Sequence, residues 1–146
     1  MVAPKSPYGL IQEEFQHDPW KVLVVCIFCN LTRRTESEPY MREFFALWPT
    51  ARDASQADHE QVRDLIKTLG LADRRAKTLI KMSQDYLTKS WHDDPRCLYG
   101  IGEYAHAAYQ IFCKHQWALI PEPKDGALKK YWKWVNSKED QDARGA

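Results

Sequence analysis

Apolar residues recur along the chain at helical spacing, and glycine and proline stand at the edges of the apolar blocks. The clearest block is the almost continuous apolar stretch from residue 19 to 30, which Asp18 can cap and Pro19 can begin, as is common at helix N-termini. A helix this apolar is expected to be buried on most of its sides. The chain shows no sustained strand alternation, Asn-Gly hairpin turn or repeat of fixed length. The pattern therefore predicts an all-α chain.

Further amphipathic segments follow near residues 37–48, 58–69, 73–87, 103–113 and 126–137. We expect Ser37 to open the first segment, Asp58 and Asp73 to cap the next two, and Gly70 to stop the helix that Asp58 begins. The last residues are polar and should fray. We therefore expect an N-terminal tail over residues 1–5, one domain over 6–137 and a polar C-terminal tail over 138–146.

Composition fits a single folded domain of 146 residues, with 44% hydrophobic residues and six tryptophans to fill a core. Lys and Arg total 21 and Asp and Glu total 20, so the net charge of +1 excludes a protein that coats a polyanion by bulk attraction.

The longest apolar run falls far short of the roughly 20 residues of a membrane helix. With no apolar core of a signal peptide at the N-terminus, we expect an intracellular protein without membrane contact.

Residues 98–102 (LYGIG) carry two glycines that flank one aliphatic side chain. This spacing predicts a tight hairpin between two helices, in which Ile101 enters the core and Gly100 and Gly102 leave backbone amides free. Free amides at a helix N-terminus form an anion site suited to a phosphate. From these five residues alone, a plain helix–helix turn is an equally good interpretation.

Together, the hairpin, the helix after it, a proline-containing loop and Asp125 resemble the helix-hairpin-helix DNA glycosylase superfamily. Further motifs are similar to the glycosylase domain of the methyl-CpG-binding-domain thymine DNA glycosylases. They are residues 6–13 (SPYGLIQE), 17–21 (HDPWK), 27–30 (IFCN), 69–71 (LGL), 75–78 (RAKT), 85–89 (DYLTK) and 111–113 (IFC). The resemblance covers about residues 6–136 and implies an all-α helix-hairpin-helix fold, a compact bundle with a cleft between two helical lobes.

Asp125 is the catalytic residue that the resemblance implies. A carboxylate near the anomeric carbon stabilises the oxocarbenium character that develops when a glycosidic bond breaks, and it can orient the attacking water. A place at the start of the last helix favours its ionised form. Taken by its position alone, Asp125 could also be a helix cap and nothing more.

The resemblance also implies a pocket for an extruded base. Tyr104 stands where bifunctional relatives carry the lysine that forms a Schiff base, which a phenol cannot form, so base release without strand cleavage is implied. The amide of Gln12 can donate to and accept from a pyrimidine edge, and Ile11 and Cys29 would be pocket walls. The alternatives are that Tyr104 packs under the hairpin and that Gln12 is an ordinary surface residue.

Two leucines match the wedge positions that fill the space left by the base. Leu31 stands where the family carries arginine; an apolar wedge can enter a base stack but cannot bond to the unpaired guanine. Arg33 or Arg34 could take over that contact if the loop shifts. Leu71 matches the second wedge, with a C-cap contact after Gly70 as the alternative.

Basic residues gather in two windows of the sequence. Residues 67–81 hold five cations against one carboxylate (+4), and residues 124–133 hold four against one (+3). We expect Arg75 and Lys77 in the first window to bind phosphate together with the hairpin residues. A solvated helix face is the alternative, and the salt dependence of binding separates the two.

The cysteines predict no cofactor. Cys26 and Cys29 lie within an apolar run with no second pair to complete a zinc site, and no cysteine follows Cys113 to build an iron–sulfur cluster. We expect the thiols to be free and no residue to bind a metal. The resemblance leaves open a monovalent cation held by hairpin carbonyls.

These observations lead to a monofunctional DNA glycosylase of base excision repair, which removes thymine or uracil mispaired with guanine and leaves an abasic site. Its partner would be double-stranded DNA with a mismatched or damaged pyrimidine, bound by a monomer, in the nucleus if the source is eukaryotic and otherwise inside the cell with DNA. One alternative is a helix-hairpin-helix module that binds duplex DNA without chemistry. Another is a glycosylase/lyase in which Lys124 or Lys129 attacks the sugar.

Overall fold

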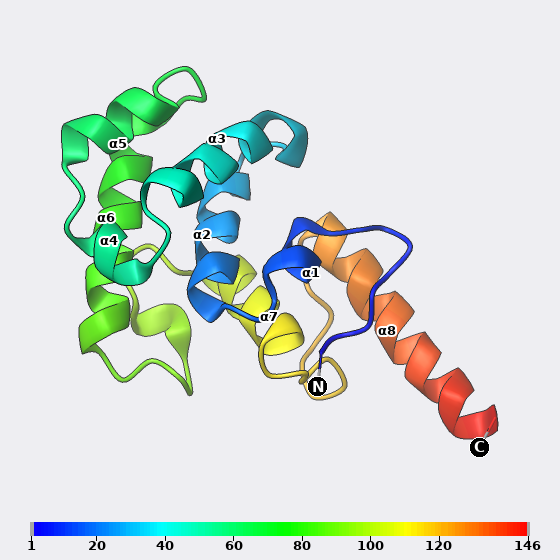
Figure 1. Cartoon of the computed structure of the whole chain (residues 1–146). Coiled ribbons are helices and arrows are strands. Elements are labelled where there is room, and N and C mark those ends of the chain that lie inside the picture. Colours follow the sequence, from blue (N-terminus) through cyan, green and yellow to red (C-terminus); the bar gives the residue numbers. More distant parts are fainter. Residues whose placement is uncertain (1, 146) are drawn as a thin grey trace.

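The computed structural model describes residues 2–145, which are helical with no strand in that range (Figure 1). The elements are α1 (Ile11–Phe15), α2 (Pro19–Cys29), α3 (Arg34–Leu47), α4 (Ala51–Ser55), α5 (His59–Ile66), α6 (Ala72–Thr88), the 3-10 helix η1 (Pro95–Cys97), α7 (Glu103–Phe112) and α8 (Gly126–Gly145). The predicted all-α class is confirmed.

Helix α2 occupies the centre of the molecule. Eight of its eleven residues are buried, and it contacts α1, α3, α6 and α7. The predicted start is confirmed: Asp18 accepts a hydrogen bond from the backbone N–H of Lys21 at 3.3 Å, and Pro19 is the first helical residue. Because α2 carries apolar side chains on nearly all of its faces, other helices must cover each face.

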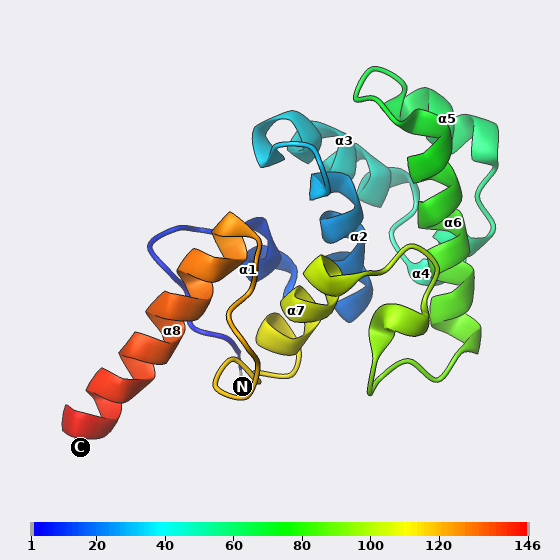
Figure 2. The same cartoon turned by 180° about the vertical axis from the view of Figure 1, so that it is seen from behind.

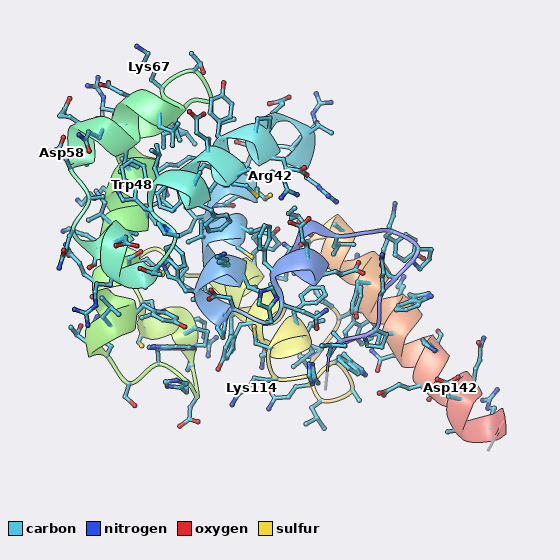
Figure 3. The ribbon with its side chains drawn as sticks, in the orientation of Figure 1. Arg42, Trp48, Asp58, Lys67, Lys114 and Asp142 are labelled. Atoms are coloured by element: carbon cyan, nitrogen blue, oxygen red, sulfur yellow. The ribbon has the colours of Figure 1, made fainter. Side chains whose placement is uncertain are left out.

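Two groups of helices lie on either side of α2. Helices α4, α5 and α6 form one lobe, and α1, α7 and α8 form the other, with α3 passing between them (Figure 1); Figure 2 shows the same division from behind. Arg42 of α3 reaches α1, where both of its terminal nitrogens donate to the carboxylate of Glu14 at 2.8 Å (Figure 3). The lobes are thus joined by α2, and an ion pair ties α3 to α1.

Three local predictions were wrong. Helix α3 begins at Arg34, one turn before the predicted start at Ser37, and it holds Pro39 in its second turn. Helix α4 was not predicted; Thr50 caps it by accepting from the N–H of Asp53. Helix α6 has Leu71 at its N-cap, whereas the predicted cap Asp73 lies in the first turn and forms an ion pair with Arg63 at 2.9 Å.

The two expected tails are structured where they are described. The backbone N–H of buried Ala3 donates to the side chain of Gln16, and the hydroxyl of Tyr131 donates to the carbonyl of Pro4, both at 2.6 Å. At the other end, α8 continues to Gly145, and Asp142 lies on the part that extends away from the lobe (Figure 3). No helix between residues 2 and 145 combines the length and apolarity needed to cross a membrane.

The glycine hairpin of residues 98–102 connects η1 to α7. Leu98 and Ile101 are buried, as predicted for Ile101, and the N–H of Ile101 donates to the carbonyl of Leu98 at 3.2 Å. Gly100 has a φ of +74°, and a Cβ atom there would overlap the Cγ2 methyl of Thr78 on α6. Glycine at this position therefore allows both the turn and the close approach of the two lobes.

Replacing Gly100 by alanine should lower the free energy of unfolding by about 2–4 kcal/mol, because the left-handed φ and the overlap with Thr78 both oppose a side chain. Urea unfolding measures the change. Gly102→Ala is the matched control, since a Cβ there meets nothing within 4 Å and its φ is −114°. Adding Thr78→Ser, which removes the overlapping methyl, should restore part of the loss; equal stability of the Gly100 and Gly102 variants would contradict this account.

Candidate functional site

The five residues predicted for catalysis and base binding line one cavity of about 640 Å³. They come from three helices and one helix start: Ile11 and Gln12 from α1, Cys29 from the end of α2, Tyr104 from α7, and Asp125 from the residue before α8. Sequence reasoning did not place the other lining residues there, which are Tyr8, Leu10, Thr32, Arg33, Arg34, Gly126, Ala127 and Lys130.

A hydrogen bond between Gln12 and Tyr104 crosses the floor of this cavity. The Gln12 amide nitrogen donates to the Tyr104 hydroxyl at 2.9 Å and to the thiol sulfur of Cys26 at 3.8 Å. Gln12 is only 3% exposed, and its amide oxygen accepts no hydrogen bond within residues 2–145. Since no fully buried side-chain N or O atom in that range lacks a partner, this oxygen is accessible, and Gln12 lines the cavity.

Burial keeps the phenol and the thiols at the cavity uncharged. It raises the pKa of Tyr104 far above its ordinary value, so the phenol stays protonated and can donate into the cavity while accepting from Gln12. Burial also raises the pKa of Cys29 to about 11 and that of Cys26 further. The Gln12–Tyr104 pair thus offers the cavity one free acceptor and one donor, with neutral thiols beside them.

Asp125 both caps α8 and has an oxygen left free. Its Oδ2 accepts from the backbone N–H of Leu128 at 3.0 Å, while Oδ1 makes no hydrogen bond in the described part of the chain. The two readings of this residue, cap and reactive carboxylate, are therefore compatible. The cap fixes the carboxylate in place and lets the other oxygen line the cavity.

A second cavity of about 510 Å³ also includes Tyr104 and Asp125. Its other polar lining side chains are Arg96, Glu103, His106, Gln110, Glu122 and Lys124. Burial lowers the pKa of His106, so its imidazole is neutral near pH 7. No sequence pattern indicated this second opening, because its lining comes from separate loops and one face of α7.

The two predicted wedge leucines both point outward. Leu31 is 82% exposed and Leu71 is 51% exposed, and both have left-handed backbones, with φ of 64° and 53°. They line a hollow of about 170 Å³ together with Tyr99 and Gly100 of the hairpin. The two leucines and the hairpin therefore border one hollow.

The predicted phosphate site stays a prediction, but the structure shows which of its groups are free. The amides of Gly100 and Gly102 donate to no acceptor among the described residues, but the amide of Ile101 is used in the turn, so Ile101 anchors the hairpin and was wrongly included as a phosphate ligand. Lys77 is exposed, with its ammonium 5.7 Å from the Tyr99 ring centroid. Lys81 lies 5.2 Å from the same ring and had not been singled out.

Arg75 is not available to phosphate, so that prediction was wrong. The residue is 4% exposed, and its guanidinium donates to the carbonyls of Asn30 and Gly70, each at 3.0 Å, and to the hydroxyl of Thr32. The signal was present in the sequence: Arg75 shares a helical face with Leu79 and Met82, which are buried. Spacing on that face, rather than charge, indicates an inward side chain.

No metal site is found in the described range: residues 2–145 contain no group of three or more His, Cys, Asp and Glu side chains placed to bind an ion. Cys26, Cys29, Cys97 and Cys113 are free thiols. A cation at the hairpin stays a prediction.

Comparison with known families decides the fold family. Residues 32–145 match the model of the HhH-GPD superfamily base excision DNA repair proteins. The chain belongs to the HhH-GPD superfamily. This membership confirms the resemblance described from the motifs and the helix-hairpin-helix fold inferred from it.

Individual members of the superfamily are similar over longer or shorter stretches. A methyl-CpG-binding domain protein 4-like protein of Arabidopsis thaliana is 38% identical over 134 residues, which is 92% of this chain and 30% of that protein. A thymine-DNA glycosylase of Aeropyrum pernix is 31% identical over 67 residues (46% and 30%), and a thymine/uracil-DNA glycosylase of Pyrobaculum aerophilum is 29% identical over 94 residues (60% and 41%). The chain therefore spans less than half the length of these relatives.

The raised pKa of Cys29 predicts slow alkylation. At pH 8 only about one thiol in a thousand would be ionised with a pKa of about 11, and the reactive fraction should rise about tenfold per pH unit. Mass spectrometry after iodoacetamide treatment between pH 7 and 9.5 should therefore show slow, pH-dependent labelling of Cys29. The exposed Cys97 is the internal control, and equal rates for the two thiols at pH 8 would contradict the burial of Cys29.

Proposed function

We propose that this domain is a monofunctional DNA glycosylase that extrudes thymine or uracil opposite guanine and hydrolyses the bond between base and sugar. The observation that carries the proposal is the shared cavity, where a free oxygen of Asp125 lies with the Gln12–Tyr104 pair. The relatives from Aeropyrum pernix and Pyrobaculum aerophilum, named a thymine-DNA and a thymine/uracil-DNA glycosylase, support the same substrate class.

Base selection follows from the hydrogen-bonding pattern of the cavity. Thymine and uracil carry an N–H at N3 between two carbonyls, and this N–H would donate to the free amide oxygen of Gln12 while the Tyr104 hydroxyl donates to a carbonyl. Cytosine has an acceptor at N3, which would face the Gln12 oxygen without a proton between them. Such an unpaired contact is costly in a buried site, so cytosine is disfavoured.

Cleavage would use Asp125 as the charged group. As the bond between the sugar and the base lengthens, positive charge grows on the anomeric carbon and the free carboxylate oxygen stabilises it. Water then adds to that carbon, and the base leaves with a proton from the solvent or from the added water. Position 104 offers a phenol instead of an amine, so no Schiff base forms there.

An excision assay tests this proposal. It uses end-labelled duplexes with G·T, G·U, A·T, G·C and 8-oxoguanine pairs, analysed with and without hot alkali. Alkali-dependent breaks at G·T and G·U are expected, since abasic sites break under alkali. Breaks before alkali would instead support a lyase, for which Lys124 and Lys130 each line a cavity that includes Asp125. Binding of duplex DNA without abasic sites would support a non-catalytic module.

Replacing Asp125 by asparagine should lower the single-turnover rate of excision by about 100- to 1,000-fold, the scale of losing one preorganised catalytic group. Asparagine caps helices as well as aspartate does, so the α8 cap and the melting temperature should be kept. DNA affinity should also be unchanged. Excision at the wild-type rate by this variant would show that the reactive group lies elsewhere.

Replacing Leu31 by arginine should raise the preference for G·T over A·T by about tenfold, because a well-placed contact to a base contributes about 1–3 kcal/mol of discrimination. Leucine can fill the stack but cannot bond to the unpaired guanine. Leu31→Gln, which is polar but uncharged, is the control. An unchanged ratio of single-turnover rates would indicate that guanine is read by another residue, of which Arg33, with an 86% exposed side chain, is the nearest.

We further propose that the domain acts as a monomer on double-stranded DNA, in the nucleus if its source is eukaryotic.

A further inference from the structure

We propose that Arg75 is a positioning residue that ties Leu31 and Leu71 to one guanidinium, so that the two side chains enter duplex DNA as a unit. The wedge role of the two leucines rests on the proposed function. The tie between their loops rests on the structure of the free protein.

The hydrogen bonds of Arg75 repeat the same pattern in both loops. Its Nη2 donates to the carbonyl of Asn30, the residue before Leu31, and its Nη1 donates to the carbonyl of Gly70, the residue before Leu71, both at 3.0 Å. Nη2 also donates to the hydroxyl of Thr32 on the far side of Leu31. One planar group therefore fixes the peptide that leads into each leucine.

Both leucines need such support, because their backbones are left-handed. Only three non-glycine residues in the described range have positive φ, and Leu31 and Leu71 are two of them. A left-handed backbone persists at a non-glycine residue only where surrounding contacts hold it. The exposed leucine side chains make little packing of their own, so the carbonyl contacts to Arg75 must supply much of that support.

Arg75 also carries a buried charge with no carboxylate among its hydrogen-bond acceptors. Each of these acceptors is neutral. Burial lowers the pKa of this guanidinium, which reflects the cost of removing the charge from water. An apolar side chain would fill the same space at lower cost, so stability alone does not explain an arginine there, whereas the connection of two distant loops does.

The hairpin of residues 98–102 lies next to Leu31, Leu71 and Arg75. The hollow between the leucines is also lined by Tyr99 and Gly100, and Gly100 packs against Thr78, one turn of α6 after Arg75. Arg75 thereby fixes both wedges relative to the surface proposed for phosphate. If one loop moves, the other should move with it.

A double-mutant cycle tests the coupling. Leu31→Ala, Leu71→Ala and the double variant are compared in the wild-type and Arg75→Gln backgrounds, and base extrusion is followed by the fluorescence of 2-aminopurine beside a G·T pair. In the wild-type background, the double variant should differ from the product of the single effects by roughly threefold or more, as residues that act together do. In the Arg75→Gln background, the effects should multiply. An interaction factor that is the same in both backgrounds would overturn the proposal.

Matched variants separate position from charge. Arg74→Gln removes the same charge from the exposed neighbouring residue; it should weaken DNA binding at low salt but leave the interaction factor unchanged. Arg75→Lys, which can reach one or two of the acceptors, should recover part of the extrusion that Arg75→Gln loses. If Arg75→Gln does not fold, Thr32→Val carries the test, because it removes one acceptor and leaves the guanidinium in place.

Hydrogen exchange of the free protein keeps this inference distinct from the proposed function. Arg75→Gln should speed amide exchange in residues 30–33 and 70–72 together, with no change in α8. Faster exchange in only one loop, or in neither, would overturn the tie even if the protein excises bases. Conversely, excision of no base by the wild-type protein would overturn the proposed function, and the exchange result would still decide the role of Arg75.

Discussion

The burial of α2 is the constraint on which the rest of the molecule depends. An eleven-residue helix with almost no polar face must be covered on every side, and α1, α3, α6 and α7 do so. The two lobes therefore meet at the C-terminal end of α2. There, Cys29 enters the wall of the base cavity, and the next residues form the loop that carries Leu31. The position of the candidate site follows from how the core is closed.

Within that site, a structural contact and a free polar atom belong to the same side chain. Asp125 uses one oxygen to cap α8 and keeps the other free, and Gln12 uses its nitrogen to hold Tyr104 and keeps its oxygen free. Each free atom is held in place by the bonded half of its own side chain. Under the proposed function, such preorganisation would spare the protein a rearrangement when a base enters, as electrostatic catalysis requires.

Much of this arrangement could be predicted from the sequence, for reasons that particular residues make clear. Asp18, Asp58 and the hairpin of residues 98–102 act through neighbours in the chain, so local patterns suffice. The residues of the base cavity came from the family resemblance, because no local pattern brings α1 and α7 together. For Arg75, the buried face it shares with Leu79 and Met82 could have indicated an inward side chain, but its acceptors, up to 45 residues away, could not be predicted from the sequence.

Ala3 and Pro4, near the start of the chain, contact two of the helices that border the cavity. Ala3 is bonded to Gln16, just after α1, and Pro4 to Tyr131 of α8, so a short extended segment holds together the two helices whose ends present Gln12 and Asp125. Neither Ala3 nor Pro4 lines the base cavity. The spacing of the helices that carry Gln12 and Asp125 is therefore set partly by contacts outside the cavity. Under the proposed function, changes at residues 3 and 4 would alter selectivity and rate without any contact to DNA.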